Sequence, residues 1–311
     1  MLTFFTTPKP FRGHEAIIQR NALRSWTLLH PDVEVILFGD DEGAAEVCAE
    51  LGLRHEPYVE RHESGTKYLN YMFARAQQVA RNHYVCFSNC DIILFSDFWE
   101  AFEKVLLWRE RKRFLLVGRR WDTDITELIN FAERDWGRHL QSFARTHGFQ
   151  QTEDWIDFFL FSKGLYLDMP SLIVGHGWWD GWMIWKALSD KVPVLDVSPC
   201  VLAVHQNHGY AREFGRLKGS GADALSQVNL ARIGGTLQNH RSMAEATHRL
   251  TTTGIKNNWG RWLSLAKRTA LGSIVALIGR RVHWAFQTYL WHPFLNLTRP
   301  VRHAVGLRQR R

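Results

Sequence analysis

Short apolar runs alternate with amphipathic segments along the first 205 residues, and this order predicts a mostly parallel α/β sheet. The runs typical of strands cover residues 2–6, 33–38, 53–58, 84–93, 114–118, 155–162, 192–197 and 202–205. Apolar residues recur at helical spacing over residues 14–30, 39–52, 67–82, 98–112 and 179–189, whereas 123–153 shows no regular pattern. Alternating strands and helices of this kind build a parallel sheet that is covered by helices.

The fourth apolar run is interrupted by a polar turn that carries a carboxylate. Residues 84–95 are almost wholly apolar, except around Asn89-Cys90-Asp91. Ligands of open α/β sheets bind outside the carboxyl ends of the strands, so Asp91 stands where a ligand is expected. Carboxylate oxygens suit Mg²⁺ or Mn²⁺ bound to a diphosphate. The alternative is an Asp that only caps the next turn.

A glycine-rich aromatic turn, GHGWWDGW at residues 175–182, leads into the helix predicted at 179–189. Asp180 stands near the start of that helix, where it either caps the helix or acts as a general base toward an acceptor hydroxyl. The rings of Trp178, Trp179 and Trp182 either stack on an acceptor sugar or pack in the core.

Two histidines follow the last predicted strand, in the sequence His205-Gln206-Asn207-His208. Imidazoles three residues apart can complete the coordination of Mn²⁺ or bind a phosphate oxygen, and a simple polar turn is the alternative. A zinc site that combines these histidines with Cys86 and Cys90 is less favoured, because the cysteine spacing does not match common structural zinc sites.

The chain resembles glycosyltransferases of the GT-A fold in its order of elements, in Asn89-Cys90-Asp91, in the Gly-Trp-Trp-Asp-Gly-Trp turn and in His-Gln-Asn-His-Gly-Tyr. The resemblance covers about residues 1–235 and is to a bacterial group of nucleotide-diphospho-sugar transferases. It implies a Rossmann-type sheet sandwiched by helices, with a divalent metal held on Asp91. Asn89 stands where the family pattern has an Asp, which lowers the expected negative charge of the site.

The resemblance also implies roles for individual residues. Asp180 corresponds to the acid that deprotonates the acceptor in inverting enzymes. The chemistry of His205 and His208, considered above, adds them to Asp91 as expected metal ligands. Residues expected to contact the donor are Thr6, Thr7, Phe38, Gly39, Asp40, Lys67, Asn70, Asn89 and Arg120. Ordinary turn chemistry, a solvated helix start and surface salt bridges are the alternatives for these donor contacts.

The expected activity is transfer of a sugar from a UDP- or GDP-linked donor to a glycan or lipid-linked acceptor, assisted by Mn²⁺ or Mg²⁺. The main rival is a catalytically silent module of the same fold that binds a nucleotide sugar or a glycan, and Asn89 favours it. A nucleotidyltransferase fits less well, because TTPKP at residues 6–10 stands where such enzymes carry a glycine-rich phosphate loop.

The positive charge of the chain is concentrated at its end. The net charge is +8, but residues 241–311 hold 13 Lys or Arg and one acid, Glu245, which gives +12 and leaves −4 for residues 1–240. This distribution argues against a nucleic-acid surface on the main domain. Residues 236–311 are therefore expected to form a separate basic, aromatic helical tail.

Tryptophan and tyrosine beside Arg and Lys suit a helix that lies on an anionic membrane surface, and the apolar run 269–279 is too short to span a bilayer. The alternatives for this tail are a helical hairpin packed on the main domain or on a second subunit and, less favoured, nucleic-acid binding.

The four cysteines contain no Cys-x-x-Cys pair, and three of them lie in patterns that predict burial, which is typical of a reducing compartment. The first residues, MLTFF, lack the features of a cleaved export signal. We therefore expect a cytoplasmic protein bound peripherally to the inner face of the plasma membrane.

Overall fold

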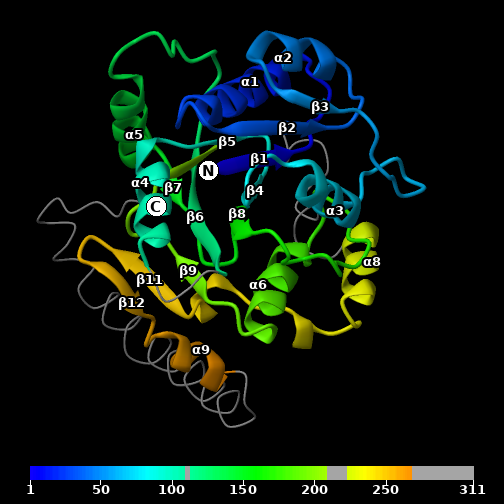
Figure 1. Ribbon diagram of the computed structural model, residues 1–311, viewed down its shortest axis with the longest axis vertical. Helices are drawn as coiled ribbons and strands as arrows, with labels where there is room; N and C mark the ends of the chain where they lie inside the picture. Colours follow the sequence, from blue (N-terminus) through cyan, green and yellow to red (C-terminus); the bar gives the residue numbers. More distant parts are fainter. Residues whose placement is uncertain (109–112, 209–222, 268–311) are drawn as a thin grey trace, which may run out of the picture. The chain divides into compact units, whose positions relative to one another are not determined.

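The computed structural model describes residues 1–108, 113–208 and 223–267 (Figure 1). The chain divides into two compact units, Met1–Asn258 and Trp259–Arg311. The predicted boundary at residue 235 is wrong, because strands β11 (His248–Thr251) and β12 (Gly254–Asn257) extend the main sheet. Within the described ranges, no helix has both the length and the apolar character needed to cross a bilayer.

The main unit is built on one large sheet. Its strands, among the described residues, are β1 (Leu2–Thr6), β2 (Glu34–Phe38), β3 (Arg54–Glu56), β4 (Tyr84–Ser88), β5 (Ile92–Ile93), β6 (Leu115–Thr123), β7 (Phe149–Gln150), β8 (Ile156–Ser162), β9 (Val194–Asp196), β10 (Ala203–Gln206), β11 and β12. The order is β12-β11-β9-β6-β8-β4-β1-β2-β3; β7 and β10 pair with β6, and β5 pairs with β10.

The strand pairing confirms the predicted mostly parallel sheet and shows that it is mixed. In the part of the chain that the structure describes, six of the eleven strand pairings are parallel. The neighbours β3, β2, β1 and β4 all run in the same direction, whereas β8 runs antiparallel between β4 and β6. The carboxyl ends of β1, β2 and β4 therefore meet at one edge of the sheet.

The predicted helices are present with shifted ends. The described helices are α1 (Gly13–Thr27), α2 (Ala44–Leu51), α3 (Leu69–Val79), α4 (Ser96–Leu106), α5 (Trp136–His147), α6 (Trp179–Ser189), α8 (Ala224–Arg232) and α9 (Arg261–Lys267), with 3₁₀ turns η2 (Leu237–Asn239) and η3 (Met243–Glu245). Helix α5 occupies the stretch that showed no regular pattern. The end of the helix predicted at 98–112 falls partly outside the described residues.

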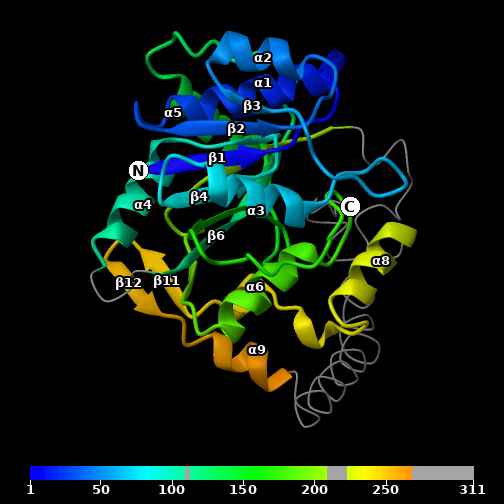
Figure 2. The ribbon, with the colours of Figure 1, turned by 45° about the vertical axis from the view of Figure 1, so that its right-hand side comes forward.

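The strands read as continuous apolar runs because both faces of the sheet are buried. Phe4 and Phe5 are neighbours in β1, yet Phe4 packs with α1, α2 and α4, while Phe5 packs with α3 and α6. The views in Figures 1 and 2 show α1 and α2 on one side of the sheet and α3 and α6 on the other. Cys48, Cys86 and Cys90 are buried free thiols, as the sequence predicted.

Candidate active site

A cleft of about 310 Å³ opens at the carboxyl ends of β1, β2 and β4. Thr7 follows β1, Asp41 follows β2, and the Asn89–Asp91 turn follows β4, so three neighbouring parallel strands each contribute to it. Small-molecule sites in open α/β sheets lie at this edge and have volumes of this order. The cleft is lined by Thr7–Pro10, Glu15, Ile18, Gln19, Asp41, Arg61, Gly65–Lys67, Asn89–Asp91 and Val174–His176.

Asp91, His205 and His208 come together beside this cleft. His205 lies on β10, which pairs antiparallel with β5 and places His205 opposite Ile92, next to Asp91 in the chain. The Asp91 Oδ2 atom is 3.0 Å from His208 Nε2 and 3.6 Å from His205 Nε2. One ligand atom from each of the three side chains lies within 4.8 Å of the others, an arrangement that can hold a metal ion.

A further carboxylate orients His205. Strand β10 also pairs in parallel with β6, which sets His205 opposite Asp122, and His205 Nδ1 is 3.1 Å from Asp122 Oδ1. Burial opposes the charged form, but Asp91 and Asp122 outweigh it and raise the pKa of His205. Burial likewise works to raise the pKa of Asp91, but His205 and His208 hold it well below its usual range.

These three residues fit a divalent cation. The second carboxylate oxygen of Asp91, Oδ1, is buried without a hydrogen-bond partner. The Asp122 carboxylate lies 3.1 Å from the far nitrogen of His205, the position from which a carboxylate commonly supports a metal-binding imidazole. A set of one carboxylate and two imidazoles suits Mn²⁺ better than Mg²⁺, because Mg²⁺ prefers oxygen ligands.

Arg120 lies on β6 between two carboxylates. Its Nη1 atom is 2.8 Å from Asp157 Oδ2, and its Nε atom is 2.8 Å from Asp122 Oδ1. Burial alone would lower the pKa of Arg120, but Asp157 and Asp122 raise it, so the guanidinium stays charged. Arg120 is bound to these two carboxylates and does not line the cleft. The structure therefore does not support the predicted contact between Arg120 and the donor phosphates.

Asp157 connects Arg120 to the turn after β4. The Asn89 side-chain N–H donates to Asp157 Oδ1 at 2.5 Å, and the Asn89 backbone N–H donates to the Asp157 carbonyl at 2.9 Å. This bond uses the amide nitrogen of Asn89 and leaves its oxygen available to the cleft. The sequence analysis missed Asp157, although it is the only charged residue in the apolar run 155–162.

Among the predicted donor contacts, Thr7, Lys67 and Asn89 line the cleft. Lys67 is buried: its Nζ donates to the Pro8 carbonyl at 2.8 Å and forms an ion pair with Asp41. Burial lowers the pKa of Lys67, and the contact with Asp41 opposes that effect. A fixed positive charge therefore lies in the wall of the cleft.

The remaining predicted donor residues do not line the cleft; they are Thr6, Phe38, Gly39, Asp40, Asn70 and Arg120. Thr6 and Phe38 are completely buried at the ends of their strands. Asp40 accepts a hydrogen bond from Arg61 at 2.6 Å on the surface, whereas Asp41 faces the cleft. Gly39 has a φ of +113°, and a Cβ there would lie 2.7 Å from the Asp41 carboxylate, so its role is to let the chain turn.

His176 is a cleft residue that no prediction singled out. Its Nδ1 atom is 2.8 Å from Asp223 Oδ1, and Asp223 caps α8 by accepting from the Ser226 backbone N–H at 3.0 Å. The Gly177 N–H donates to Ser226 Oγ at 2.8 Å, which ties the same loop to α8. The imidazole is thus held in one orientation at the cleft wall.

Asp180 occupies the first turn of α6 and is partly buried. Burial raises the pKa of Asp180 to about 6, an effect that the Gly181 N–H opposes and that the charges of Asp157 and Asp154 reinforce. Trp178, immediately before the helix, has a left-handed φ of +82°.

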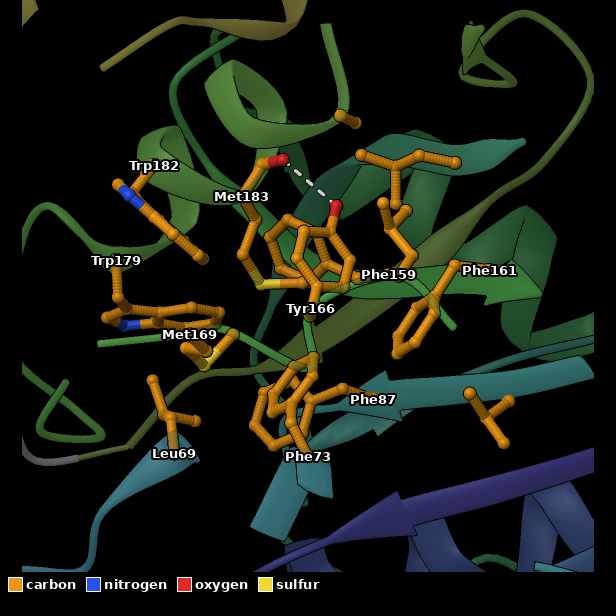
Figure 3. Packing of buried hydrophobic residues seen from close by; sticks show 14 of the residues in the cluster. Leu69, Phe73, Phe87, Phe159, Phe161, Tyr166, Met169, Trp179, Trp182 and Met183 are labelled. Carbon is orange, nitrogen blue, oxygen red and sulfur yellow. Dashed lines mark hydrogen bonds between the residues drawn. The ribbon is translucent and has the colours of Figure 1, made fainter. Parts of the chain in front are cut away.

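Two of the three tryptophans expected to bind an acceptor are core residues, which corrects that prediction. Trp179 packs against Phe87 with the ring centroids 5.5 Å apart, and Trp182 packs against Tyr166 at 6.2 Å (Figure 3). Tyr166 in turn donates its hydroxyl to the Met183 carbonyl at 2.9 Å. Neither Trp179 nor Trp182 offers an open ring face to a sugar; Trp178 remains partly exposed.

No protein-family model matches this sequence, and no curated protein matches it significantly. The structure is similar to glucosyl-3-phosphoglycerate synthase from Mycobacterium tuberculosis in complex with phosphoglyceric acid, with a TM-score of 0.45 and 12% identity over 77% of this chain and 80% of that chain. It is also similar to S. aureus TarS 1–349 in complex with UDP-GlcNAc, with a TM-score of 0.43 and 13% identity over 68% of this chain and 61% of that chain.

TM-scores of 0.43 and 0.45 describe a loose likeness of fold and carry no argument about the function of this chain.

Proposed function

We propose that this chain is a metal-assisted glycosyltransferase that takes a sugar from a nucleotide-diphosphate donor and passes it to a hydroxyl of a glycan or lipid-linked acceptor. The observation that carries the proposal is the cleft at the carboxyl ends of β1, β2 and β4, with Asp91 in its lining and His205 and His208 against Asp91. A nucleotide sugar suits that place, because the crevice outside the strand ends is where nucleotides bind in such sheets.

Asp91, His205 and His208 would hold the cation. A divalent cation bound there would offset the negative charge that develops on the departing diphosphate. Asp122 would keep His205 Nδ1 protonated and its Nε2 directed at Asp91, from which Nε2 is 3.6 Å away.

The cations in the cleft wall suit the donor phosphates. Lys9, Arg61 and Lys67 all line the cleft, and each is steadied by a neighbouring carboxylate. Because their positions are fixed before the donor arrives, little side-chain entropy is lost when phosphate binds. The free oxygen of Asn89 would accept a hydrogen bond from a donor hydroxyl.

Asp180 would act as the base that accepts the proton of the attacking hydroxyl. A carboxylate whose pKa is raised to about 6 by burial is still mostly ionised at pH 7 and is a stronger base than an ordinary Asp. An inverting reaction needs a base of this kind on the acceptor side. In a retaining reaction the same residue would only orient the acceptor.

The test is a panel of UDP-, GDP-, CMP- and dTDP-sugars with purified protein, each with and without Mn²⁺. We expect one donor to raise the melting temperature in a metal-dependent way and to be hydrolysed slowly in the absence of an acceptor. The Asp91→Asn variant is the control for the metal. If no donor raises the melting temperature or is hydrolysed, the proposal is wrong.

A catalytically silent binding module is the second candidate, and Asn89 favours it. An amide at the first position of the metal turn removes one negative charge, and its nitrogen is already bound to Asp157. Donor binding without hydrolysis, in both wild type and an Asn89→Asp variant, would support this module over the enzyme.

We also propose that the basic tail holds the protein on the inner, anionic face of a cytoplasmic membrane. Most of the tail lies outside the described residues. In its described part, α9 and the residues before it expose Trp259, Trp262 and Leu263, which are 74%, 59% and 71% accessible. Exposed tryptophan and leucine on a basic helix are typical of an interfacial segment.

A further inference from the structure

Trp155 is an exposed aromatic side chain next to the carboxylates of the candidate active site. It immediately precedes β8 and keeps 42% of its surface accessible, whereas Trp179 and Trp182 are 6% and 4% accessible. Single exposed aromatic residues are common on protein surfaces and need no ligand to explain them. The surroundings of Trp155 are what distinguish it.

One face of the Trp155 ring rests on Arg120. The guanidinium carbon of Arg120 is 4.6 Å from the ring centroid, and ion pairs of 2.8 Å to Asp122 and Asp157 hold Arg120 in place. The Trp155 backbone N–H also donates to the Thr152 carbonyl at 3.2 Å, which closes a tight turn. Because one face is covered, the accessible surface of the ring belongs mainly to its other face and its edge.

The same neighbours connect Trp155 to both sides of the proposed reaction. Asp157, two residues further along, binds Asn89, which lines the donor cleft. Asp154 and Asp157 stand on either side of Trp155 in the chain, and their negative charges contribute to the raised pKa of Asp180. Trp155 therefore lies close to the turn that faces the donor, to which Arg120 and Asp157 connect it.

We propose that the open face of Trp155 is an acceptor subsite that binds the pyranose ring of a saccharide. This inference rests on the proposed glycosyltransferase function and names its acceptor class. A flat ring that Arg120 holds in place on one face can bury the apolar C–H face of a sugar on its other face at low entropic cost. This subsite takes the role that the sequence analysis assigned to Trp179 and Trp182.

The experiment uses the full chain labelled with 5-fluorotryptophan and observed by ¹⁹F NMR in the presence of UDP and Mg²⁺, which is diamagnetic and does not broaden the resonances. The chain has 14 tryptophans, so the Trp155 resonance is assigned as the one missing from a Trp155→Phe variant. The probes are the methyl pyranosides of glucose, galactose, mannose and N-acetylglucosamine, titrated to tens of millimolar.

We expect at least one pyranoside to shift the Trp155 resonance in a saturable way. In the variants, which lack this resonance, the affinity is measured on the sugar's own protons by saturation-transfer difference NMR. The dissociation constant of that sugar should rise at least tenfold in Trp155→Ala and stay within about threefold in Trp155→Phe, because phenylalanine retains a flat ring. Phe143→Ala is the matched control: Phe143 is 41% accessible and stacks on His147 with the centroids 4.5 Å apart. This control should leave sugar binding unchanged.

The outcomes separate this inference from the proposed function. Metal-dependent donor hydrolysis without any shift of the Trp155 resonance overturns the subsite and leaves the transferase standing. Unchanged sugar affinity in Trp155→Ala overturns the subsite too. Saturable, Trp155-dependent sugar binding in a protein that hydrolyses no donor supports the subsite and rejects the transferase.

Discussion

Replacing Asp180 by asparagine should lower turnover strongly and at the same time make the protein more stable. The folded state raises the pKa of Asp180 from an ordinary value of 3.8 to about 6, which corresponds to about 3 kcal/mol of destabilisation once the group is ionised. Because Asp180 is only partly buried, solvent screens part of this cost, and we expect a gain of about 1 to 2 kcal/mol in Asp180→Asn at pH 7.5.

Because the pKa of Asp180 is raised in the folded protein, the contribution of Asp180 to stability depends on pH. Between about pH 4 and pH 6 the unfolded chain has lost the Asp180 proton while the folded protein still keeps it. The contribution of Asp180 to wild-type stability therefore falls as pH rises through this window and is constant above it. Asp180→Asn lacks this dependence, so the two proteins should differ little near pH 4 and most above pH 6.5.

Thermal unfolding from pH 4 to pH 8, together with donor hydrolysis, measures both effects. At pH 7.5 we expect Asp180→Asn to melt about 3 to 6 °C higher and to have a kcat lower by a factor on the order of 10² to 10⁴, with donor affinity unchanged. Asp32→Asn is the control, because the Asp32 side chain is 67% exposed and should change neither quantity. A lower melting temperature in Asp180→Asn, or an unchanged kcat, would refute the reasoning.

Four further predictions follow from named contacts. Asp91→Asn should remove the Mn²⁺-dependent rise in melting temperature and lower turnover by roughly a hundredfold or more, and EDTA should reproduce the first effect in wild type. His176→Ala should weaken donor binding about tenfold by isothermal titration calorimetry while leaving chemical unfolding nearly unchanged. Trp182→Ala should cost about 3 to 5 kcal/mol of unfolding free energy in urea, because a 4%-accessible ring leaves a cavity. Deletion after Asn258 should leave the main unit folded but free it from anionic liposomes; continued flotation would contradict the membrane role.

Much of the fold was predictable because it follows from local patterns. Runs such as Leu2–Thr6 and Ile156–Ser162 are mostly apolar and buried at every position, which is typical of strands buried on both faces. Strands β11 and β12 were not predicted, since His248–Thr251 contributes only one fully buried side chain and Gly254–Asn257 none. Short strands with so few buried side chains have too weak a pattern to be recognised without their partners.

The chemistry was predictable by residue type and only partly by position. Asp91 and the pair His205 and His208 could be chosen because each follows an apolar run, and the structure brings all three together. Arg120 had the right type for phosphate binding, but the register of β6 directs it between two carboxylates.

The sequence by itself determined which segments are strands and helices and which polar residues follow them, because both depend on neighbours a few positions away. Only the tertiary structure decided which of those residues meet. Asp91 and His208 are 117 positions apart, and their 3.0 Å contact exists because β10 pairs with both β5 and β6. Likewise, the choice between a buried and an open tryptophan depended on what packs against each ring, which no local pattern in the chain records.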